Sequence, residues 1–178
     1  MARTKSYMLP LNTKAPTFSL PNPVDDSLVS IDKVKGGKGT MVIFMCNHCP
    51  YVLHLLDKIV EATNEIKTWG INTVAISSND IVNYPDDRPE LMKRLASENT
   101  FGFPYLYDET QEVALAYEAA CTPDFYLFDA NLKLVYRGKF DDSRPQNDIP
   151  VTGHDLLQAC ENLVNKKPQN TEQMPSLG

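Results

Sequence analysis

The sequence contains no long hydrophobic run. Its longest uninterrupted apolar stretch, residues 41–46, is far shorter than the roughly 18 to 20 residues that a membrane helix requires. The first ten residues carry positive charge with no apolar segment behind it, so they do not read as a secretory signal. We therefore predict a cytoplasmic protein that spans no membrane.

An excess of positive charge is also lacking. The formal net charge is −6, from 17 lysines and arginines against 23 aspartates and glutamates. An acidic surface repels the phosphates of nucleic acids and anionic lipids. Neither nucleic acid nor a membrane surface is therefore an expected partner.

Cysteine is scarce, and its spacing does not indicate a disulfide framework. Cys46 and Cys49 are three residues apart, whereas Cys121 and Cys160 are isolated. The cytosol keeps structural thiols reduced, so a Cys-x-x-Cys pair there indicates redox or metal chemistry. The chain has no second Cys-x-x-Cys and no Cys-x-x-His to complete a tetrahedral metal site. We therefore favour redox chemistry and expect no metal and no cofactor.

A strand, a helix and a second strand surround the cysteine pair. Residues 40–45 and 71–77 are apolar runs suited to strands that are buried on both faces. Residues 50–69, between them, repeat apolar side chains at helical spacing. This succession is typical of a parallel crossover, so the sheet is expected to be at least partly parallel.

Shorter elements are predicted on both sides of this unit. Strands are expected at 15–21, 27–31, 104–107, 125–129 and 134–140, and helices at 89–97, at 111–119 and after residue 152. The last helix is expected to begin with a capping box made by Thr152 and Asp155. We divide the chain into an N-terminal extension (1–14), one α/β domain (15–166) and a polar tail (167–178).

The spacing of Cys46 and Cys49 permits a reversible disulfide. Cysteines at positions i and i+3 at a helix start have Cα atoms within disulfide reach. Unpaired amide hydrogens and the helix dipole stabilise a thiolate there, so we expect Cys46 to have a lowered pKa and to act as the nucleophile. His48, as an imidazolium, would lower that pKa further. The alternative for His48 is an exposed, solvated loop side chain.

The segment Phe44-Met-Cys-Asn-His-Cys-Pro-Tyr-Val52 resembles the peroxiredoxin-like branch of the thioredoxin superfamily, close to the alkyl hydroperoxide reductase and thiol-specific antioxidant proteins. Residues 15–20, 122–129 and 136–142 support the resemblance, which covers most of residues 15–166. It implies a thioredoxin-like α/β fold, with a central mixed β-sheet flanked by α-helices and an N-terminal β-hairpin extension.

The resemblance also implies site residues near the cysteine pair. Pro123 is expected to follow a cis peptide bond and to face the pair, with Thr122 and Cys121 beside it as substrate-binding residues. Cys121 could act as a third thiol or a metal ligand, although packing is the simpler interpretation. Cys160 falls on the apolar stripe of the last helix and is expected to be core.

The chain departs from peroxiredoxins around their reactive cysteine. In the pattern Pro-x-x-x-Thr-x-x-Cys, Cys49 takes the reactive position, but the proline falls on Val42 and the threonine on Cys46. The distant arginine falls at or near Pro123. Without these donors, stabilisation of the departing oxygen is largely lost.

The chain departs from thioredoxin as well. Met45 replaces the tryptophan that precedes the first cysteine, and the strand at 40–45 carries no carboxylate to take a cysteine proton. A water molecule or His48 would have to serve. Efficient general reductase activity is therefore not expected.

Two loops pair acidic residues with a following Arg-Pro. They are Asp86-Asp87-Arg88-Pro89 and Asp141-Asp142-Ser143-Arg144-Pro145. Aspartate and proline are ordinary turn and cap residues, so a structural role is favoured. The alternative is a rim around the active site that selects a partner.

Three functions remain open from the sequence. The favoured one is a thiol–disulfide oxidoreductase that cycles Cys46 and Cys49, with His48 and Pro123 completing the catalytic set. It would act on protein or small-molecule disulfides or thiols, with an unidentified electron donor. The alternatives are a thiol peroxidase, an antioxidant enzyme using Cys49, and a metal-binding protein using Cys46, Cys49 and Cys121. The oligomeric state stays open.

Overall fold

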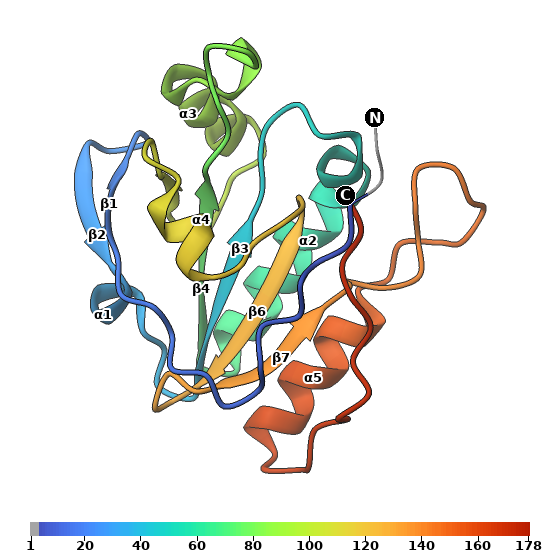
Figure 1. The fold of residues 1–178 in the computed structure, drawn as a ribbon. Coiled ribbons are helices and arrows are strands. Elements are labelled where there is room, and N and C mark those ends of the chain that lie inside the picture. The colour runs from blue at the N-terminus through green and yellow to red at the C-terminus, as the bar shows by residue number, and fades with distance from the viewer. Residues whose placement is uncertain (1–3) are drawn as a thin grey trace.

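A computed structural model describes residues 4–178. At its centre lies a five-stranded sheet with the strand order β5-β4-β3-β6-β7 (Figure 1). The strands are β3 (Gly39–Phe44), β4 (Ile71–Ser77), β5 (Tyr105–Tyr107), β6 (Asp124–Asp129) and β7 (Leu134–Gly138). β3, β4 and β5 are parallel, whereas β6 is antiparallel to β3 and β7 is antiparallel to β6. The predicted mixed sheet and parallel crossover are thus confirmed.

The remaining elements surround this sheet. β1 (Ser19–Asn22) and β2 (Ser27–Ser30) form the predicted N-terminal hairpin. The helices are α1 (Ile31–Val34), α2 (Pro50–Thr68), α3 (Pro89–Glu98), α4 (Glu112–Ala116) and α5 (His154–Val164), with a 3₁₀ turn, η1 (Pro85–Asp87). Within residues 4–178, no helix combines the length and the apolar character that crossing a bilayer requires.

The two faces of β3 bury two separate cores. Successive strand side chains point to opposite faces, so Met41 and Ile43 pack with α2 and α5, whereas Val42 and Phe44 pack with Tyr117 and the N-terminal segments. All six residues of β3 are buried, as the continuous apolar run predicted. The carboxyl end of this central strand delivers the cysteine segment.

Two local predictions were wrong. Ile31, expected to end a strand, begins the short helix α1, which buries Ile31 and Val34. The capping box is absent, because α5 follows Gly153, which is in the left-handed region (φ 69°). The N–H groups of Thr152 and Gly153 donate instead to Asp141 Oδ2, each at 2.7 Å.

The two ends of the described chain lie together near the carboxyl end of β3 (Figure 1). Lys5 and Leu177 form an antiparallel bridge, and the N–H of Thr4 donates to Gly178 O at 2.8 Å. From residue 4 onwards, the N-terminal extension therefore packs against the last residues of the polar tail. Residues 1–3 of that extension lie outside the described residues.

Candidate active site

Both cysteines of the pair lie between β3 and α2. The helix begins at Pro50, and Cys49 is its N-cap residue, with extended backbone angles (φ −65°, ψ 121°). A proline ring disfavours the helical conformation in the residue before it, so α2 cannot extend back to Cys46. The expectation that Cys46 occupies the helix terminus is therefore wrong, because Cys49 lies there.

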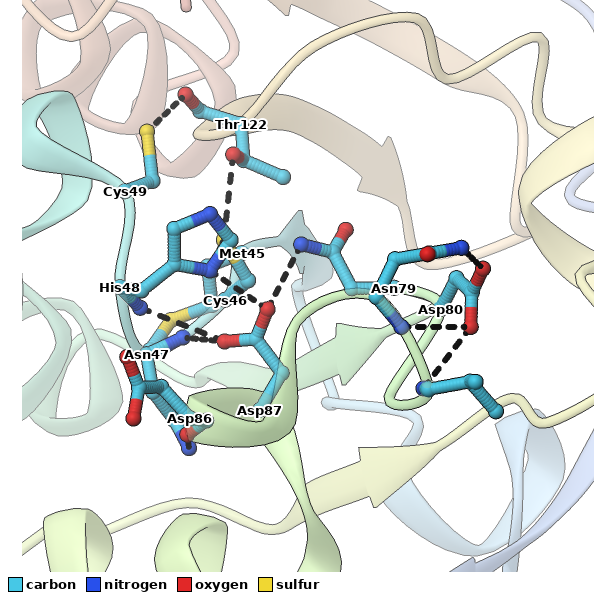
Figure 2. A network of polar contacts seen from close by, with 12 residues as sticks. Met45, Cys46, Asn47, His48, Cys49, Asn79, Asp80, Asp86, Asp87 and Thr122 are labelled. Atoms are coloured by element: carbon cyan, nitrogen blue, oxygen red, sulfur yellow. Dashed lines mark hydrogen bonds and ion pairs between the residues drawn. The ribbon is translucent and has the colours of Figure 1, made fainter.

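Both sulfurs contact Thr122 (Figure 2). The two thiols are close enough that each shifts the pKa of the other. The Cys49 thiol donates to Thr122 O at 3.2 Å, and Cys46 Sγ lies 3.5 Å from Thr122 Oγ1. All four cysteines of the chain are free thiols here. The predicted pairing therefore brings two thiols together at a point that Thr122 also contacts.

The environment favours the thiolate at Cys49. The pKa of Cys49 is lowered to about 5, first by the hydrogen bond from the Cys46 thiol and against the opposing effect of burial. Thr122 and the N–H groups of Val52 and Tyr51, at the start of α2, contribute to the same lowering. The carbonyl of Thr122 accepts a hydrogen bond from the Cys49 thiol and so opposes ionisation, but the groups that lower the pKa have the larger combined effect.

Cys46 has the opposite tendency. Its hydrogen bond to Cys49 and its burial raise the pKa of Cys46, and the negative charge of Asp87 adds to this. Cys46 is 1% exposed and Cys49 is 6% exposed. The prediction that Cys46 carries the lowered pKa is thus wrong. Both ionisation and exposure indicate Cys49 as the attacking sulfur.

A buried carboxylate, Asp87, lies beside the pair (Figure 2). Its Oδ1 accepts the backbone N–H of Asn47 at 2.7 Å and that of His48 at 3.2 Å. Its Oδ2 accepts the amide of Asn79 at 2.8 Å and lies 2.6 Å from His48 Nδ1. Asp87 comes from η1, about forty residues along the chain from the cysteines. The interpretation of its Asp-Asp loop as an ordinary turn missed this contact.

His48 is held by neighbours on two sides. Its ring stacks on Tyr84, with centroids 4.8 Å apart and an interplanar angle of 7°. Its Nδ1 lies 3.9 Å from Cys46 Sγ and closer to Asp87. Its side chain is 22% exposed, so the alternative of a solvated loop histidine is wrong. His48 therefore lies beside Cys46 as one member of a pair with Asp87.

The segment 121–123 lies opposite the pair, as expected. The Thr122–Pro123 peptide bond is cis, which confirms the prediction. Cys121 is half-buried, its Sγ lies 3.9 Å from Pro123 O, and burial raises its pKa. Cys160 is fully buried in the core, where burial raises its pKa to about 12. Cys160 therefore has no part in the site.

A pocket of about 540 Å³ opens in front of the sulfurs. Cys46, Cys49 and Cys121 line it, together with His48 and Thr122. Five of the six residues that the sequence proposed for the site thus share one cavity. The sixth, Pro123, is joined to Thr122 by the cis bond.

One group of side chains in residues 4–178 has the arrangement to hold a metal ion. Cys46 Sγ, His48 Nδ1 and a carboxylate oxygen of Asp87 lie within 4.8 Å of one another. Sulfur, nitrogen and oxygen ligands of these types suit zinc. This group shares only Cys46 with the set considered from the sequence, which was Cys46, Cys49 and Cys121.

The sheet order, the flanking helices and the cysteine pair before α2 define a thioredoxin-fold protein. The sequence profile of the Redoxin family matches residues 10–156, so the chain belongs to the Redoxin family. Membership supports a thioredoxin-like redox function and an oxidoreductase role. No curated protein matches the chain at a significant level.

Solved structures share this fold along the whole chain. An uncharacterized conserved protein from Geobacillus kaustophilus is 50% identical, with a TM-score of 0.98 over 100% of this chain and 94% of that one. A hypothetical protein from Sinorhizobium meliloti 1021 is 38% identical, with a TM-score of 0.94 over 97% and 94%. The thioredoxin domain of a thiol-disulfide oxidoreductase from Bacteroides vulgatus is 21% identical, with a TM-score of 0.68 over 88% and 99%. At 21% identity, this last similarity shows the fold alone.

Proposed function

We propose that this protein is a thiol–disulfide oxidoreductase that cycles Cys46 and Cys49 between dithiol and disulfide. The observation that carries the proposal is the contact of both thiols with Thr122 in the lining of one open pocket, with Cys49 at a helix N-terminus and Cys46 beside a buried carboxylate. Each sulfur then has its own task. A cytoplasmic location belongs to the proposal, because a reducing compartment supplies thiols that regenerate the dithiol.

Cys49 makes the first bond. Its thiolate attacks one sulfur of a substrate disulfide in the pocket, forms a mixed disulfide and releases the other sulfur as a thiolate. The N–H groups at the start of α2 hold the Cys49 thiolate before attack. A mixed disulfide on Cys49 leaves Cys46 as the adjacent thiol.

Cys46 completes the reaction. Its proton passes to the His48–Asp87 pair, and its sulfur then attacks Cys49 Sγ, which forms the Cys46–Cys49 disulfide and releases the second substrate thiolate. The effective concentration of a neighbouring thiol makes this step fast. One substrate disulfide becomes two thiols, and an electron donor reverses the change in the protein.

Thr122 and Pro123 position the reacting sulfurs. Thr122 contacts Cys46 through its hydroxyl and Cys49 through its carbonyl, so it limits the directions from which each sulfur is accessible. Cys121 lines the same pocket, where an incoming disulfide would pass. We assign these residues to substrate positioning.

Thiol peroxidase activity is the second candidate, and the lowered pKa of Cys49 favours it. A peroxide, however, needs donors for its departing hydroxide, and the threonine and arginine of the peroxiredoxin pattern are replaced by Cys46 and Pro123. Disulfide exchange makes no such demand, because its leaving group is already a stable thiolate. We therefore place peroxide reduction second.

Stopped-flow kinetics on the reduced protein separate the two functions. With a small disulfide, Cys46→Ser should accumulate a mixed disulfide on Cys49, and Cys49→Ser should scarcely react. Cys160→Ala, which removes a buried thiol outside the site, is the control and should react as wild type does. With hydrogen peroxide, wild type should react at a rate near that of an ordinary thiolate. Fast peroxide reduction that survives Cys46→Ser and vanishes in Cys49→Ser would show a peroxidase instead.

A further inference from the structure

The two sulfurs are accessible from the pocket and are otherwise enclosed. Their exposed fractions are 1% and 6%, so a reacting disulfide has to enter the cavity. On one side Gly178 packs so closely against Thr122 that an added Cβ would lie 2.1 Å from Thr122 O. A volume of about 540 Å³ is within the range of small-molecule sites, roughly 300–1,000 Å³. The cavity therefore fits a disulfide of low molecular weight.

The wall of the pocket away from the sulfurs is largely apolar. Phe44 and Ile76 contribute from the ends of β3 and β4, and Ala114, Leu115 and Ala119 contribute from α4 and the segment after it. Leu115 is 75% exposed, so its side chain is available to a ligand. Covering such a surface is favourable for an alkyl or aryl group. One arm of the substrate is therefore expected to be apolar.

The charges around the pocket are acidic. Asp80 lines it, and no lysine or arginine does so among residues 4–178. The N–H groups of Val82 and Asn83 and the amide of Asn83 donate to Asp80 (Figure 2). The Asn83 amide is the largest of the effects that lower the pKa of Asp80, so this carboxylate stays charged at neutral pH. A substrate with negative arms would be repelled.

Within residues 4–178, no lysine or arginine of the pocket lining offsets this field. Lys5 follows Thr4, which lines the pocket, but Lys5 is not itself a lining residue. His48 is paired with the buried Asp87, so its positive charge, when present, is already balanced. The attacking Cys49 thiolate adds a further negative charge.

We propose, resting on the function proposed above, that the substrate is a low-molecular-weight disulfide whose arms are uncharged or cationic and at least partly apolar, and that dianionic disulfides are discriminated against. The reaction transfers two electrons from the dithiol, so that one substrate disulfide leaves as two thiols and the Cys46–Cys49 bond forms.

Three disulfides of similar size test this proposal: cystamine, a dication; bis(2-hydroxyethyl) disulfide, which is neutral; and dithiodiglycolate, a dianion. Each rate with reduced wild-type protein is divided by the rate of the same disulfide with 2-mercaptoethanol. The normalised rate should fall in the order dication, neutral, dianion, by about tenfold or more from first to last at low salt. The spread should shrink at about 0.5 M salt, where charges are screened.

Two substitutions with the same charge change locate the effect. Asp80→Lys should raise the dianion's rate and lower the dication's rate, and so reverse the order. Glu161→Lys, on the exposed surface of α5 across the sheet from the pocket, should preserve it. Leu115→Gln should slow an aryl disulfide relative to the hydroxyethyl compound, because it removes apolar contact.

The outcomes separate this proposal from the function on which it rests. Equal normalised rates for the three disulfides, a fastest dianion, or a folded protein disulfide that outpaces all three would overturn the substrate assignment and leave the oxidoreductase in place. If no disulfide oxidises the pair while Cys49 alkylates normally, the proposed function falls and the substrate assignment falls with it.

Discussion

The loops 86–89 and 141–145 share a pattern of two aspartates followed by arginine and proline, yet they serve different purposes. Each buries one aspartate, Asp87 in the first loop and Asp141 in the second. Asp141 binds backbone N–H groups of Ser143, Thr152 and Gly153 and so holds the start of α5. Asp87 also binds backbone N–H groups, but its second oxygen faces a histidine and a cysteine.

The two carboxylates differ in the partners of their second oxygen. Both oxygens of Asp141 accept hydrogen bonds from backbone N–H groups, which makes Asp141 a structural cap. Asp87 satisfies the cysteine segment with Oδ1 and keeps Oδ2 for His48 and Asn79, within 4.8 Å of Cys46 Sγ. The same sequence pattern therefore produces a cap in one place and, in the proposed mechanism, a base in the other. Substitutions at the two positions should separate stability from chemistry.

The largest expected effect is that of Asp87→Asn on the second step of exchange. Removing a general base slows proton transfer by about 100-fold or more. Loss of the charge also lowers the pKa of Cys46, but that charge contributes less to the raised pKa than the Cys49 hydrogen bond and burial, so loss of the base should dominate. The measurement is the resolution rate of a mixed disulfide preformed on Cys49. Asp141→Asn is the matched control, and an equal slowing there would refute the distinction.

Next in size is the effect of Asp141→Ala on stability. It leaves three N–H groups without their charged acceptor, so the free energy of unfolding should fall by about 2–4 kcal/mol. Urea denaturation measures this, and the rate of mixed-disulfide resolution in the folded variant should match that of wild type. If the Asp141→Ala protein were as stable as wild type, the assignment of Asp141 as a cap would be wrong.

The pH dependence of Cys49 gives a third test. Because its pKa is lowered to about 5, alkylation of reduced protein should reach half its maximal rate near pH 5, against about 8.5 for free cysteine. Asp141→Asn should leave this midpoint in place. A midpoint near 8.5 in wild type, with Cys49 identified as the alkylated residue by mass spectrometry, would contradict the assignment of the attacking sulfur.

The smallest effects belong to the other aspartate of each pair. Asp86 and Asp142 are exposed, and Asp86 contacts Asn47 through its backbone carbonyl, which alanine retains. Asp86→Ala and Asp142→Ala should each change the free energy of unfolding by less than about 0.5 kcal/mol. A loss comparable with that of Asp141→Ala at either position would mean that the charge common to both aspartates, and not the burial of one of them, sets the loss of stability.

Local patterns in the sequence predict much of the fold and part of the site. The continuous apolar run predicts the buried strand β3, and the helical periodicity of the next segment predicts α2. The family resemblance predicts the cis bond before Pro123. The sequence also predicts the position of Cys49 at the helix terminus, because Pro50 disfavours a helical conformation at Cys49, the residue before it.

Asp87 could not be predicted in the same way. A turn aspartate has no periodicity, and its contact with His48 spans 39 residues. What distinguishes it from Asp86 is only the burial that the finished fold imposes. The same holds for Tyr84, whose stacking on His48 depends on how η1 is placed against the cysteine segment.

The lowered pKa of Cys49 links redox state to folding through a closed thermodynamic cycle. The folded protein stabilises the Cys49 thiolate, whereas the unfolded chain does not. A group whose pKa is lowered by folding stabilises the folded state at high pH. This stabilisation is lost as the pH falls through about 5, the pKa of Cys49 in the folded protein. The disulfide form lacks this contribution, and closing so short a loop restrains the unfolded chain only weakly. At neutral pH, reduction should therefore raise the melting temperature, so that the reductants used to unfold disulfide-bonded proteins would make this one harder to melt.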